Sequence, residues 1–451
     1  MSTVHSRLLI IGAGPGGYET ALYAASHGLE TTLIESGQLG GTCLNAGCIP
    51  TKALCRSAEL AEEFAGAGRF GFRDVAFSLD FGEVMRRKQE VVGQLRSGVE
   101  ALLGNPKIHL VRGRARFADS RTVVTDSADT AYTADDIIIA TGSVPAVLPV
   151  AGCGLPGVLT SEQLLDVEEV PRRLCVIGAG VIGLELASVF ASFGSKVTVV
   201  EYAKEVLPRF DADIAKRLRQ ALGKRGIEIV TKAEVKEIVA GESGLSVVYG
   251  RKGEDCRAEA DKVLMAVGRR PNLASLNLDD IGVEYTKKGI TVDGTMRTNV
   301  PHIYAVGDIN GINMLAHVAT AQGRRAVNAI AGIADNLRLE VVPSVVFTMP
   351  EVASVGLTED DCKERGIECR TRKSLFRSNG KALCIGETEG LCKLVCGSDG
   401  KLLGCHVIGP HAADLVQEAC ALITAGADIS LLAGTIHAHP TLSEVLPGAA
   451  I

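Results

Sequence analysis

The sequence predicts an α/β fold, because one pattern of local structure occurs twice. An apolar strand, a glycine turn, a helix and a second apolar strand follow one another in residues 8–35 and again in residues 174–201. Strands that alternate with helices are typical of a parallel sheet covered by helices. The 451 residues provide for about three domains at ~150 residues each.

The composition excludes several other classes of protein. Hydrophobic residues make up 46% and charged residues 22%, as in ordinary globular chains. The net charge of −6 offers no basic surface for nucleic acid or for an anionic membrane. The uncharged stretch 137–161 contains three prolines, so we do not expect it to span a membrane. Only seven residues precede the apolar run that begins at Leu8, so we expect no signal peptide and a cytoplasmic location.

The first repeat has the spacing of a dinucleotide-binding turn. Gly12 is expected to make the tight turn, Gly14 to let the backbone approach a pyrophosphate, and Gly17 to let helix and strand pack closely. The phosphates would lie at the positive end of the helix. Eighteen residues after Gly17, Glu35 ends the second strand, where it can accept hydrogen bonds from a ribose diol.

The second repeat places Gly178, Gly180, Gly183 and Glu201 at the same spacings. Two such sites in one chain predict one tightly held and one exchangeable dinucleotide, and FAD with a nicotinamide is the natural pair. Glu201 would repel a 2′-phosphate, and Lys204 is the only nearby cation in the sequence. The second site is therefore expected to prefer NAD to NADP.

Two cysteines separated by four residues lie between the repeats, at Cys43 and Cys48. On an ideal helix their side chains would lie about 140° apart, so a disulfide requires a distorted turn, and Gly47 supplies the freedom for one. A strained disulfide is easier to reduce than a structural one. The spacing alone also fits two buried thiols. A zinc site would need a second pair, and Cys55 does not fit an iron–sulfur pattern, so no metal site is predicted.

The remaining cysteines are expected to be reduced. Thirteen cysteines in a long chain without a secretion signal do not indicate a disulfide scaffold. Cys392 and Cys396 lie four apart on an expected strand, so they should share one face and belong to the core.

Residues 40–52, GGTCLNAGCIPTK, resemble the redox-disulfide signature of the class I pyridine nucleotide disulfide oxidoreductases, in the form typical of dihydrolipoamide dehydrogenases. The resemblance extends over nearly the whole chain. Its further motifs are residues 140–142 (ATG), 268–272 (GRRPN), 304–308 (YAVGD) and 437–444 (HAHPTLSE).

The resemblance implies a role for individual residues. Cys43 would exchange with substrate, Cys48 would face the flavin, and Lys52 would lie near the flavin N5, paired with Glu185. Asp308 would hold the ribityl hydroxyls, as Glu35 holds the ribose. The cofactor-binding residues implied in this way are Gly12, Gly14, Gly17, Glu35, Lys52, Thr141, Gly142, Gly178, Gly180, Gly183, Glu185, Glu201, Gly268, Arg269, Gly307 and Asp308.

Two histidines lie in the C-terminal motif. His439 is followed five residues later by Glu444, and a carboxylate that orients an imidazole is the usual arrangement of a general base. The resemblance implies that His439 is this base and that the His439–Pro440 bond is cis. His437 lacks a partner at that spacing, so we interpret it as a satisfied core or capping histidine.

Two features depart from the family pattern. Relatives continue with a helix after Glu444, whereas Pro447 and Gly448 are expected to stop it here. Residues 377–381 also differ from the usual run, with an expected effect on a loop near the substrate channel. Neither change touches the redox residues.

The resemblance implies four segments and one reaction. Residues 1–148 and 272–340 would form the FAD-binding part, 149–271 the NAD-binding domain, and 341–451 an α+β dimerisation domain. The reaction would be oxidation of dihydrolipoamide by NAD⁺ in a homodimer that serves a separate lipoyl-bearing protein. Mercuric, thioredoxin and glutathione reductases fit less well, because the last cysteine is Cys420 and Glu201 opposes NADP. A non-catalytic flavin-bound scaffold would not need Cys43, Cys48, His439 and Glu444 together.

Overall fold

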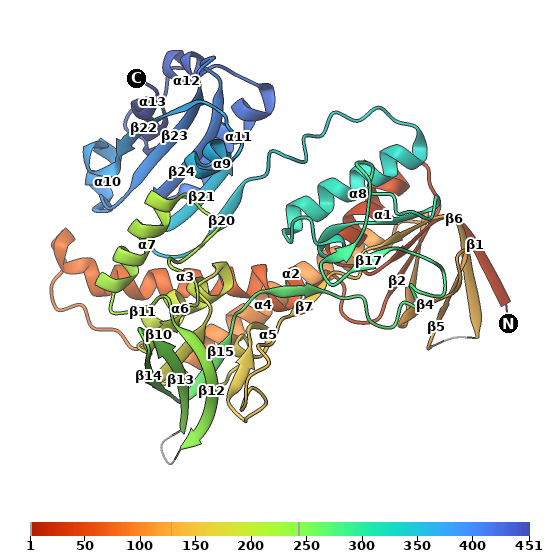
Figure 1. Cartoon of the computed structure of the whole chain (residues 1–451), viewed down its shortest axis with the longest axis horizontal. Coiled ribbons are helices and arrows are strands. Elements are labelled where there is room, and N and C mark those ends of the chain that lie inside the picture. The colour runs from red at the N-terminus through yellow and green to blue at the C-terminus, as the bar shows by residue number, and fades with distance from the viewer. Residues whose placement is uncertain (1, 128, 242–243) are drawn as a thin grey trace. The chain divides into compact units, whose positions relative to one another are not determined.

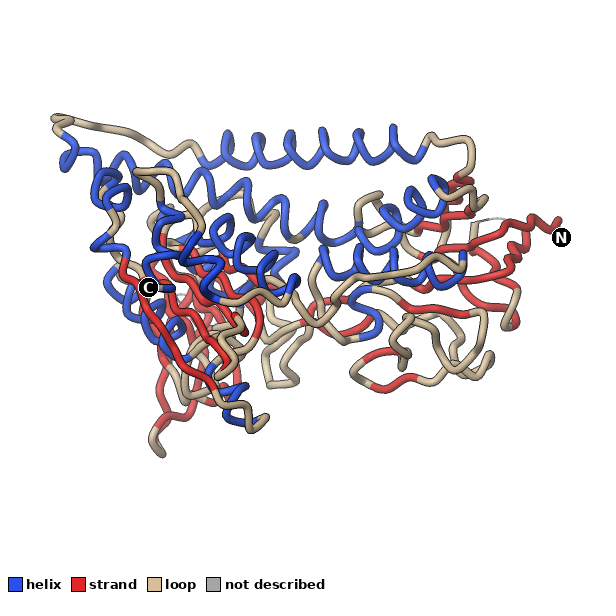
Figure 2. Tube along the Cα trace, turned by 90° about the horizontal axis from the view of Figure 1, so that it is seen from above, coloured by secondary structure: helices blue, strands red, loops and turns tan. Residues whose placement is uncertain are grey.

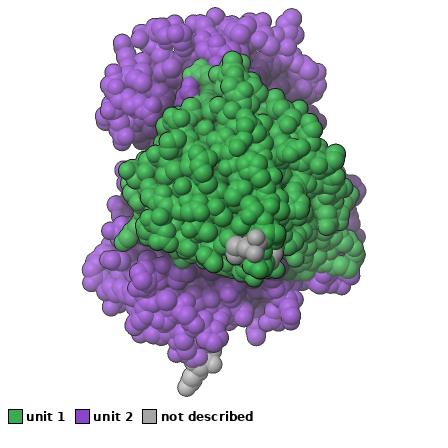
Figure 3. Space-filling view, turned by 90° about the vertical axis from the view of Figure 1, so that its right-hand side faces the viewer, with its two compact units in different colours: residues 1–53, 85–146, 269–339 green, residues 54–84, 147–268, 340–451 purple. Residues whose placement is uncertain are grey.

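The computed structural model describes residues 2–127, 129–241 and 244–451. These residues form two compact units, each of which combines parallel sheet with helices, so the predicted α/β class is confirmed. The units, coloured in Figure 3, comprise residues 1–53, 85–146 and 269–339, and residues 54–84, 147–268 and 340–451. No helix in the described part of the chain is long and apolar enough to cross a membrane.

The main sheet of the first unit contains the first repeat (Figure 1). Its strands are β1 (Ser2–Ile11), β2 (Thr31–Glu35), β3 (Ile108–Arg112), β4 (Ala115–Asp119), β5 (Thr122–Thr125), β6 (Thr130–Ile139) and β19 (Ile303–Ala305). They lie in the order β3-β2-β1-β6-β5-β4, with β19 also paired to β6. The pairs β1–β2, β1–β6, β2–β3 and β6–β19 are parallel, whereas the pairs β4–β5 and β5–β6 are antiparallel.

Helices of the first unit pack on a sheet that is apolar on both faces. Residues 8–11 of β1 are almost completely buried, as expected for a central parallel strand. Pro15 begins α1, where its missing N–H costs no hydrogen bond. The other elements that lie within this unit are α2 (Gly41–Ala46), α8 (Ala316–Ala331), η2 (Gly307–Asn310), β7 (Ser143–Pro145), β16 (Arg269–Pro271), β17 (Tyr285–Thr286) and β18 (Gly289–Ile290), besides α1 (Pro15–Ser26).

Two helices contain residues of both units. They are α3 (Cys48–Gly66) and α4 (Phe81–Leu103). The longer one, α4, is the uninterrupted coil along the upper edge of Figure 2. The 3₁₀ turn η1 (Ala67–Phe70) follows α3.

The second repeat builds a parallel sheet in the second unit. Its strands are β8 (Val158–Thr160), β9 (Arg173–Ile177), β10 (Lys196–Val200), β11 (Glu228–Val230) and β15 (Lys262–Met265), in the order β11-β10-β9-β15-β8. An antiparallel sheet beside it contains β12 (Glu234–Gly241), β13 (Gly244–Arg251) and β14 (Glu254–Ala260). The helices are α5 (Ser161–Leu164), α6 (Val181–Ser192) and α7 (Ala212–Lys224).

The C-terminal segment forms an antiparallel sheet in the order β20-β21-β24-β23-β22. Its strands are β20 (Ser344–Val346), β21 (Glu351–Gly356), β22 (Cys369–Leu375), β23 (Leu391–Gly397) and β24 (Leu402–Gly409). Its helices are α9 (Glu359–Glu364), α10 (Gly380–Ile385), α11 (Ala412–Ala425), α12 (Ile429–Gly434) and α13 (Val445–Ala450), with η3 (Phe376–Ser378) and η4 (Leu442–Glu444). As expected, Cys392 and Cys396 both lie in the core of this segment.

The expectation that Pro447 and Gly448 stop the last helix is wrong. Both residues lie inside α13. Pro447 occupies the first turn, where no helical hydrogen bond requires its N–H, so a proline is tolerated there. Val445, Leu446 and Ala449 are buried, and this packing holds the short helix against the C-terminal core.

Candidate functional site

The first glycine turn needs glycine for steric reasons. Gly12 has a φ of 103°, and a Cβ there would lie 2.5 Å from the carbonyl oxygen of Ala140. A Cβ at Gly17 would lie 1.7 Å from the Gly12 oxygen. Both carboxylate oxygens of Glu35 accept backbone N–H bonds, one of them from Ala13 at 2.6 Å. The carboxylate is therefore fixed beside the turn that opens α1.

The second turn repeats these contacts. Gly178 has a φ of 105°, and a Cβ there would lie 2.5 Å from the oxygen of Ala266. A Cβ at Gly183 would lie 2.2 Å from the Gly178 oxygen. Glu201 again accepts two backbone bonds, one from Ala179 at 2.5 Å. The repeat found in the sequence thus extends to individual hydrogen bonds.

The two turns differ in what lies against their middle glycine. A Cβ at Gly41, which has a φ of 57°, would lie only 2.6 Å from the Cα of Gly14. The backbone that begins α2 therefore closes over the first turn. Around a Cβ at Gly180, by contrast, no described atom outside the local chain lies within 4 Å.

A polar network joins three of the family motifs in the first unit. Ser143 donates to the Asp308 carboxylate at 2.5 Å, and Arg269 donates to the Ser143 hydroxyl at 2.7 Å. Thr141 donates to the carbonyl of Asn272 at 3.1 Å. The other predicted glycines of these motifs have positive φ, namely Gly142 (70°), Gly268 (111°) and Gly307 (76°).

The two cysteines lie on different helices. Cys43 is on α2, Gly47 ends that helix, and Cys48 begins α3. A Cβ at Gly47 would lie 3.0 Å from the Thr42 oxygen, a tight contact, so the break between the helices has little room for a side chain there, in agreement with the expected distorted turn. Both residues are thiols here, and they share a hydrogen bond. This bond, together with burial, raises the pKa of Cys43 well above that of an ordinary thiol, and the charge of Lys52 partly opposes the rise.

Lys52 and Glu185 are placed in separate units. Lys52 lies on α3, four residues after Cys48 and on the same side of that helix. Glu185 lies on α6, is 4% exposed, and accepts a hydrogen bond from the backbone N–H of Phe347 at 2.9 Å.

His439 and Glu444 form a hydrogen-bonded pair. The His439 Nδ1 lies 2.9 Å from a Glu444 oxygen, and the other oxygen accepts from Thr441 N at 2.8 Å. The Thr441 N–H and then the imidazole lower the pKa of Glu444. The His439–Pro440 bond is cis, as expected. Because the His439 side chain is 76% exposed, its Nε2 is open to a reactant.

Sequence reasoning missed two contacts that hold the histidine segment. Glu418 on α11 binds His437 Nε2 at 3.0 Å, which leaves this side chain only 8% exposed. Asn379 caps α10 and donates to the Thr441 carbonyl at 3.0 Å. Glu418 lies 19 residues from its histidine, so no local spacing pointed to it. Asn379 belongs to residues 377–381, which depart from the family pattern, but this departure did not indicate that Asn379 contacts Thr441.

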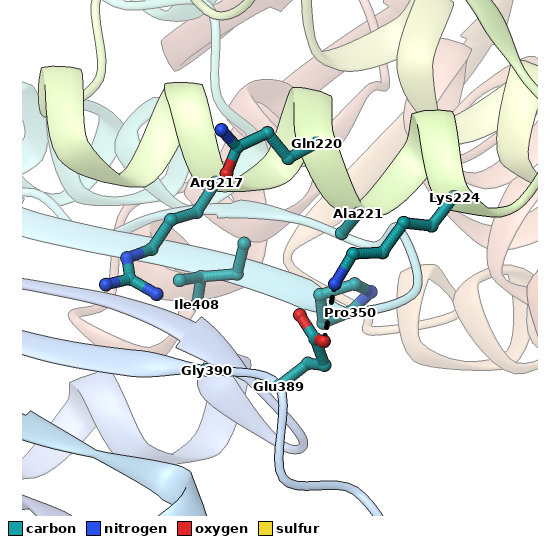
Figure 4. A pocket seen from close by; sticks show the side chains of 8 residues that line it. All are labelled: Arg217, Gln220, Ala221, Lys224, Pro350, Glu389, Gly390 and Ile408. Carbon is teal, nitrogen blue, oxygen red and sulfur yellow. Dashed lines mark hydrogen bonds and ion pairs between the residues drawn. The ribbon is translucent and has the colours of Figure 1, made fainter.

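The pocket in Figure 4 lies elsewhere, between α7 and the β23–β24 region of the second unit. Lys224 and Glu389 form an ion pair at 2.6 Å across it. It contains none of the residues that we predicted to bind cofactor or substrate. Within the described residues, no group of three or more His, Cys, Asp or Glu side chains is arranged to hold a metal ion.

Comparison with known families assigns both parts of the chain. Residues 6–323 match the family model of pyridine nucleotide-disulphide oxidoreductase, and residues 342–450 match the dimerisation domain of that family. The second match supports a homodimer.

Individual proteins are similar over their whole length. A dihydrolipoyl dehydrogenase from Geobacillus stearothermophilus is 42% identical over 99% of this chain and 96% of its own. LpdA from Mycobacterium tuberculosis superposes with a TM-score of 0.91 at 30% identity, over 99% of both chains. The HOCl-induced flavoprotein disulfide reductase RclA from Escherichia coli gives 0.88 at 30% identity, over 98% of this chain and 99% of its own.

Proposed function

The chain belongs to the pyridine nucleotide-disulphide oxidoreductase family, and from that premise we propose that it oxidises dihydrolipoyl groups with NAD⁺ through a disulfide of Cys43 and Cys48. The observation that carries this proposal is the full-length similarity to a dihydrolipoyl dehydrogenase. The hydrogen bond between the two thiols and the His439–Glu444 pair support it.

The residues present fit FAD and NAD. At the middle glycine of each turn, Gly14 or Gly180, a Cβ would project into space with no described atom beyond the local chain closer than 3.8 Å, and each turn has a fixed carboxylate beside it. We assign the turn closed by Gly41 to FAD and the open turn at Gly180 to NAD. The residues assigned to FAD are Gly12, Gly14, Gly17, Glu35, Lys52, Thr141, Gly142, Arg269, Gly307 and Asp308, and those assigned to the nicotinamide side are Gly178, Gly180, Gly183, Glu185, Glu201 and Gly268.

Two thiol–disulfide exchanges carry the reaction. His439 takes a proton from a dihydrolipoyl thiol, and the thiolate attacks Cys43 to give a mixed disulfide, with Cys48 leaving as a thiolate. The second sulfur of the substrate then attacks the substrate sulfur in that mixed disulfide and closes the lipoyl ring. Cys43 leaves as a thiolate, and the proton of the second substrate thiol passes to it. Glu444 orients the imidazole and stabilises its cation. When bound, FAD supplies a two-electron acceptor for the dithiol and a donor for NAD⁺.

His439 acts in the active site of the partner subunit in this proposal. It lies in the segment that matches the dimerisation domain, and Ile436 close by is 97% exposed in one chain. A large apolar side chain this exposed suits a surface that a second subunit covers. A twofold interface would build two equivalent shared sites.

Mixed dimers test the shared site. Cys48→Ser and His439→Ala homodimers should both be inactive, whereas the heterodimer retains one whole site. Random mixing gives about half heterodimers, hence roughly a quarter of wild-type activity. Heterodimers without activity would mean that His439 works within its own subunit.

The partner and location belong to the same proposal. The substrate is the lipoyl group of a separate protein of a 2-oxo acid dehydrogenase, acetoin dehydrogenase or glycine cleavage system. The reduced state expected for most of the thirteen cysteines supports a cytoplasmic location. The segment boundaries 1–148, 149–271, 272–340 and 341–451 are part of the proposal.

A steady-state comparison tests the reaction itself. Dihydrolipoamide, glutathione disulfide and trypanothione disulfide are assayed with both nicotinamides. We expect turnover with dihydrolipoamide and NAD⁺ to exceed every other combination. Faster turnover of either other disulfide would reject the proposal.

A further inference from the structure

A second pair of cysteines lies on two elements labelled in Figure 1, the helix α9 and the edge strand β22. Cys362 is on the helix and is completely buried, and Cys369 begins the strand and is half-buried. Both are thiols in this structure. Neither belongs to the redox pair Cys43–Cys48, and neither has a part in the reaction described above.

The sheet register places Cys369 on the face that α9 covers. Lys373 and Lys393 are paired directly on β22 and β23. Because side chains alternate along a strand, Cys369 lies on the same face as Lys373, four residues on. Glu359 of α9 reaches Lys393 on that face at 2.9 Å. Since Cys362 follows Glu359 by three residues, about one helical turn, both thiols point into the layer between helix and strand.

The chain between the two cysteines is short and tightly held. Thr358 and Asp361 form a capping box at the start of α9. At its end, Gly366 has a φ of 65°, and Ile367 N donates to the Cys362 carbonyl at 2.8 Å. The two thiols share a hydrogen bond; this bond and, to a greater extent, burial raise the pKa of Cys362 to about 11.

We propose that Cys362 and Cys369 form a second, reversible disulfide that fastens α9 to β22 when a low-molecular-weight disulfide oxidises them. Cys369, the less buried of the two residues, loses its proton and attacks the small disulfide, which releases one small thiol. Cys362 then displaces the second small thiol from the mixed disulfide. Two protein thiols thus give up two electrons and two protons, and the small disulfide becomes two thiols. The proposal does not depend on which substrate the Cys43–Cys48 pair oxidises.

The test uses the pattern of tryptic cleavage around the pair. Lys363 and Arg365 lie between the cysteines, so trypsin separates a peptide of residues 339–363 from one of 366–370, each with one cysteine. The purified holoenzyme is reduced, freed of reductant, titrated with oxidised glutathione, alkylated in acid and digested. We expect the two peptides to appear joined by a disulfide, and a reductant to separate them. Full alkylation of both cysteines at ratios that oxidise Cys43 and Cys48 would overturn the proposal.

The chain offers an internal control and a matched variant. Cys392 and Cys405 also share a thiol hydrogen bond, but both are completely buried. They should stay reduced because the oxidant cannot reach them. Oxidation should raise the Tm of the wild-type protein a few degrees more than that of Cys362→Ala, which keeps Cys43 and Cys48. Cys369→Val replaces Cys362→Ala as the variant if the alanine protein folds poorly. An equal rise in Tm on oxidation in the wild type and the variant would also overturn the proposal.

Discussion

The two dinucleotide segments share a parallel core in matching order, β3-β2-β1-β6 and β11-β10-β9-β15, and the same carboxylate contacts, yet their middle glycines lie in different surroundings. In the first segment the backbone of Gly41 closes over Gly14. A Cβ at Gly14 would lie 3.8 Å from the Cα of Gly41, whereas a Cβ at Gly180 would have no described atom within 4 Å beyond the local chain. A closed turn suits a dinucleotide that stays bound, and an open turn suits one that exchanges in each catalytic cycle.

The helix whose first residue covers the first turn, α2, also contains one of the two redox cysteines. Gly41 begins α2, and Cys43 lies two positions later on the same short helix. One element therefore both covers the first turn and presents a reactive sulfur beside it. In the second segment the chain after β10 also returns to the turn, since Leu207 N donates to the Ala179 carbonyl at 3.0 Å as Gly40 N does to that of Ala13 at 2.8 Å. It brings no described atom within 4 Å of a Cβ at Gly180, however. The same fold can thus hold a resident or an exchangeable cofactor, depending on the segment that comes after its second strand.

The largest effect is expected for Cys48→Ser, which removes the sulfur assigned to the flavin. This change should impair the chemistry of the first segment and leave that of the second segment intact. Cys48→Ser should lower dihydrolipoamide oxidation by about 10³-fold or more, because the exchange then has no second sulfur. It should also abolish the long-wavelength thiolate-to-flavin band that we expect on two-electron reduction of the wild-type protein. Reduction of the flavin by NADH, which uses the second segment, should persist. A variant that retains the band would show that Cys48 does not face the flavin.

Matched glycine variants test the closed and open turns directly. Gly41→Ala adds a Cβ at 2.6 Å from Gly14 in a left-handed conformation that alone costs about 1–2 kcal/mol. FAD affinity should fall at least about tenfold, measured by flavin retention and apoenzyme titration. Gly180→Ala should retain FAD and raise only the KM for NAD⁺, because its Cβ would project where we expect a pyrophosphate and would meet no described atom within 4 Å beyond the local chain. Equal FAD loss in both variants would remove the distinction between the turns.

Glu201 should set the nicotinamide preference of the open segment. We expect kcat/KM for NAD⁺ to exceed that for NADP⁺ by at least about tenfold, or ~1.4 kcal/mol, because the fixed carboxylate binds a ribose diol and repels a 2′-phosphate. Glu201→Gln should reduce this ratio. Glu35→Gln, the matched change in the first segment, should leave the ratio unchanged. Equal kcat/KM values in the wild-type enzyme would contradict the assignment.

The repeat was predictable because its cause is local. Strand, turn and helix lie within residues 8–35, and the glycines at 12 and 178 meet the same backbone obstruction in both copies. The Gly41–Gly14 approach and the Glu418–His437 contact join distant segments, and the sequence spacing contains no sign of either. Pro447 was misread for another reason. A proline ends a helix only beyond its first turn, and the sequence did not fix where α13 begins.

The second unit also contains a cluster of ion pairs around the buried Lys393. In the second unit, α7 is tied to the C-terminal sheet by Lys393, whose side chain is 2% exposed and bonds to Asp211, Asp213 and Glu359. Asp213 also accepts from Lys373 at 2.7 Å. The lysines, Lys373 first, lower the pKa of Asp213 to about 2.

The smallest expected effect is the pH dependence of the ion pairs that Asp213 forms with Lys373 and Lys393. Because the folded pKa of Asp213 lies below its ordinary value of 3.8, its stabilisation is complete above that pH and is lost as the pH falls toward about 2. Its side chain is 43% exposed, so the contribution should stay below about 1 kcal/mol. Asp213→Asn should therefore lower the Tm slightly at pH 6, and the gap from wild type should narrow between pH 4 and pH 3. Asp360→Asn removes the same charge from an exposed position on α9 and should show no such gap. A gap for Asp213→Asn that widens in acid would mean that the lysines do not stabilise this carboxylate.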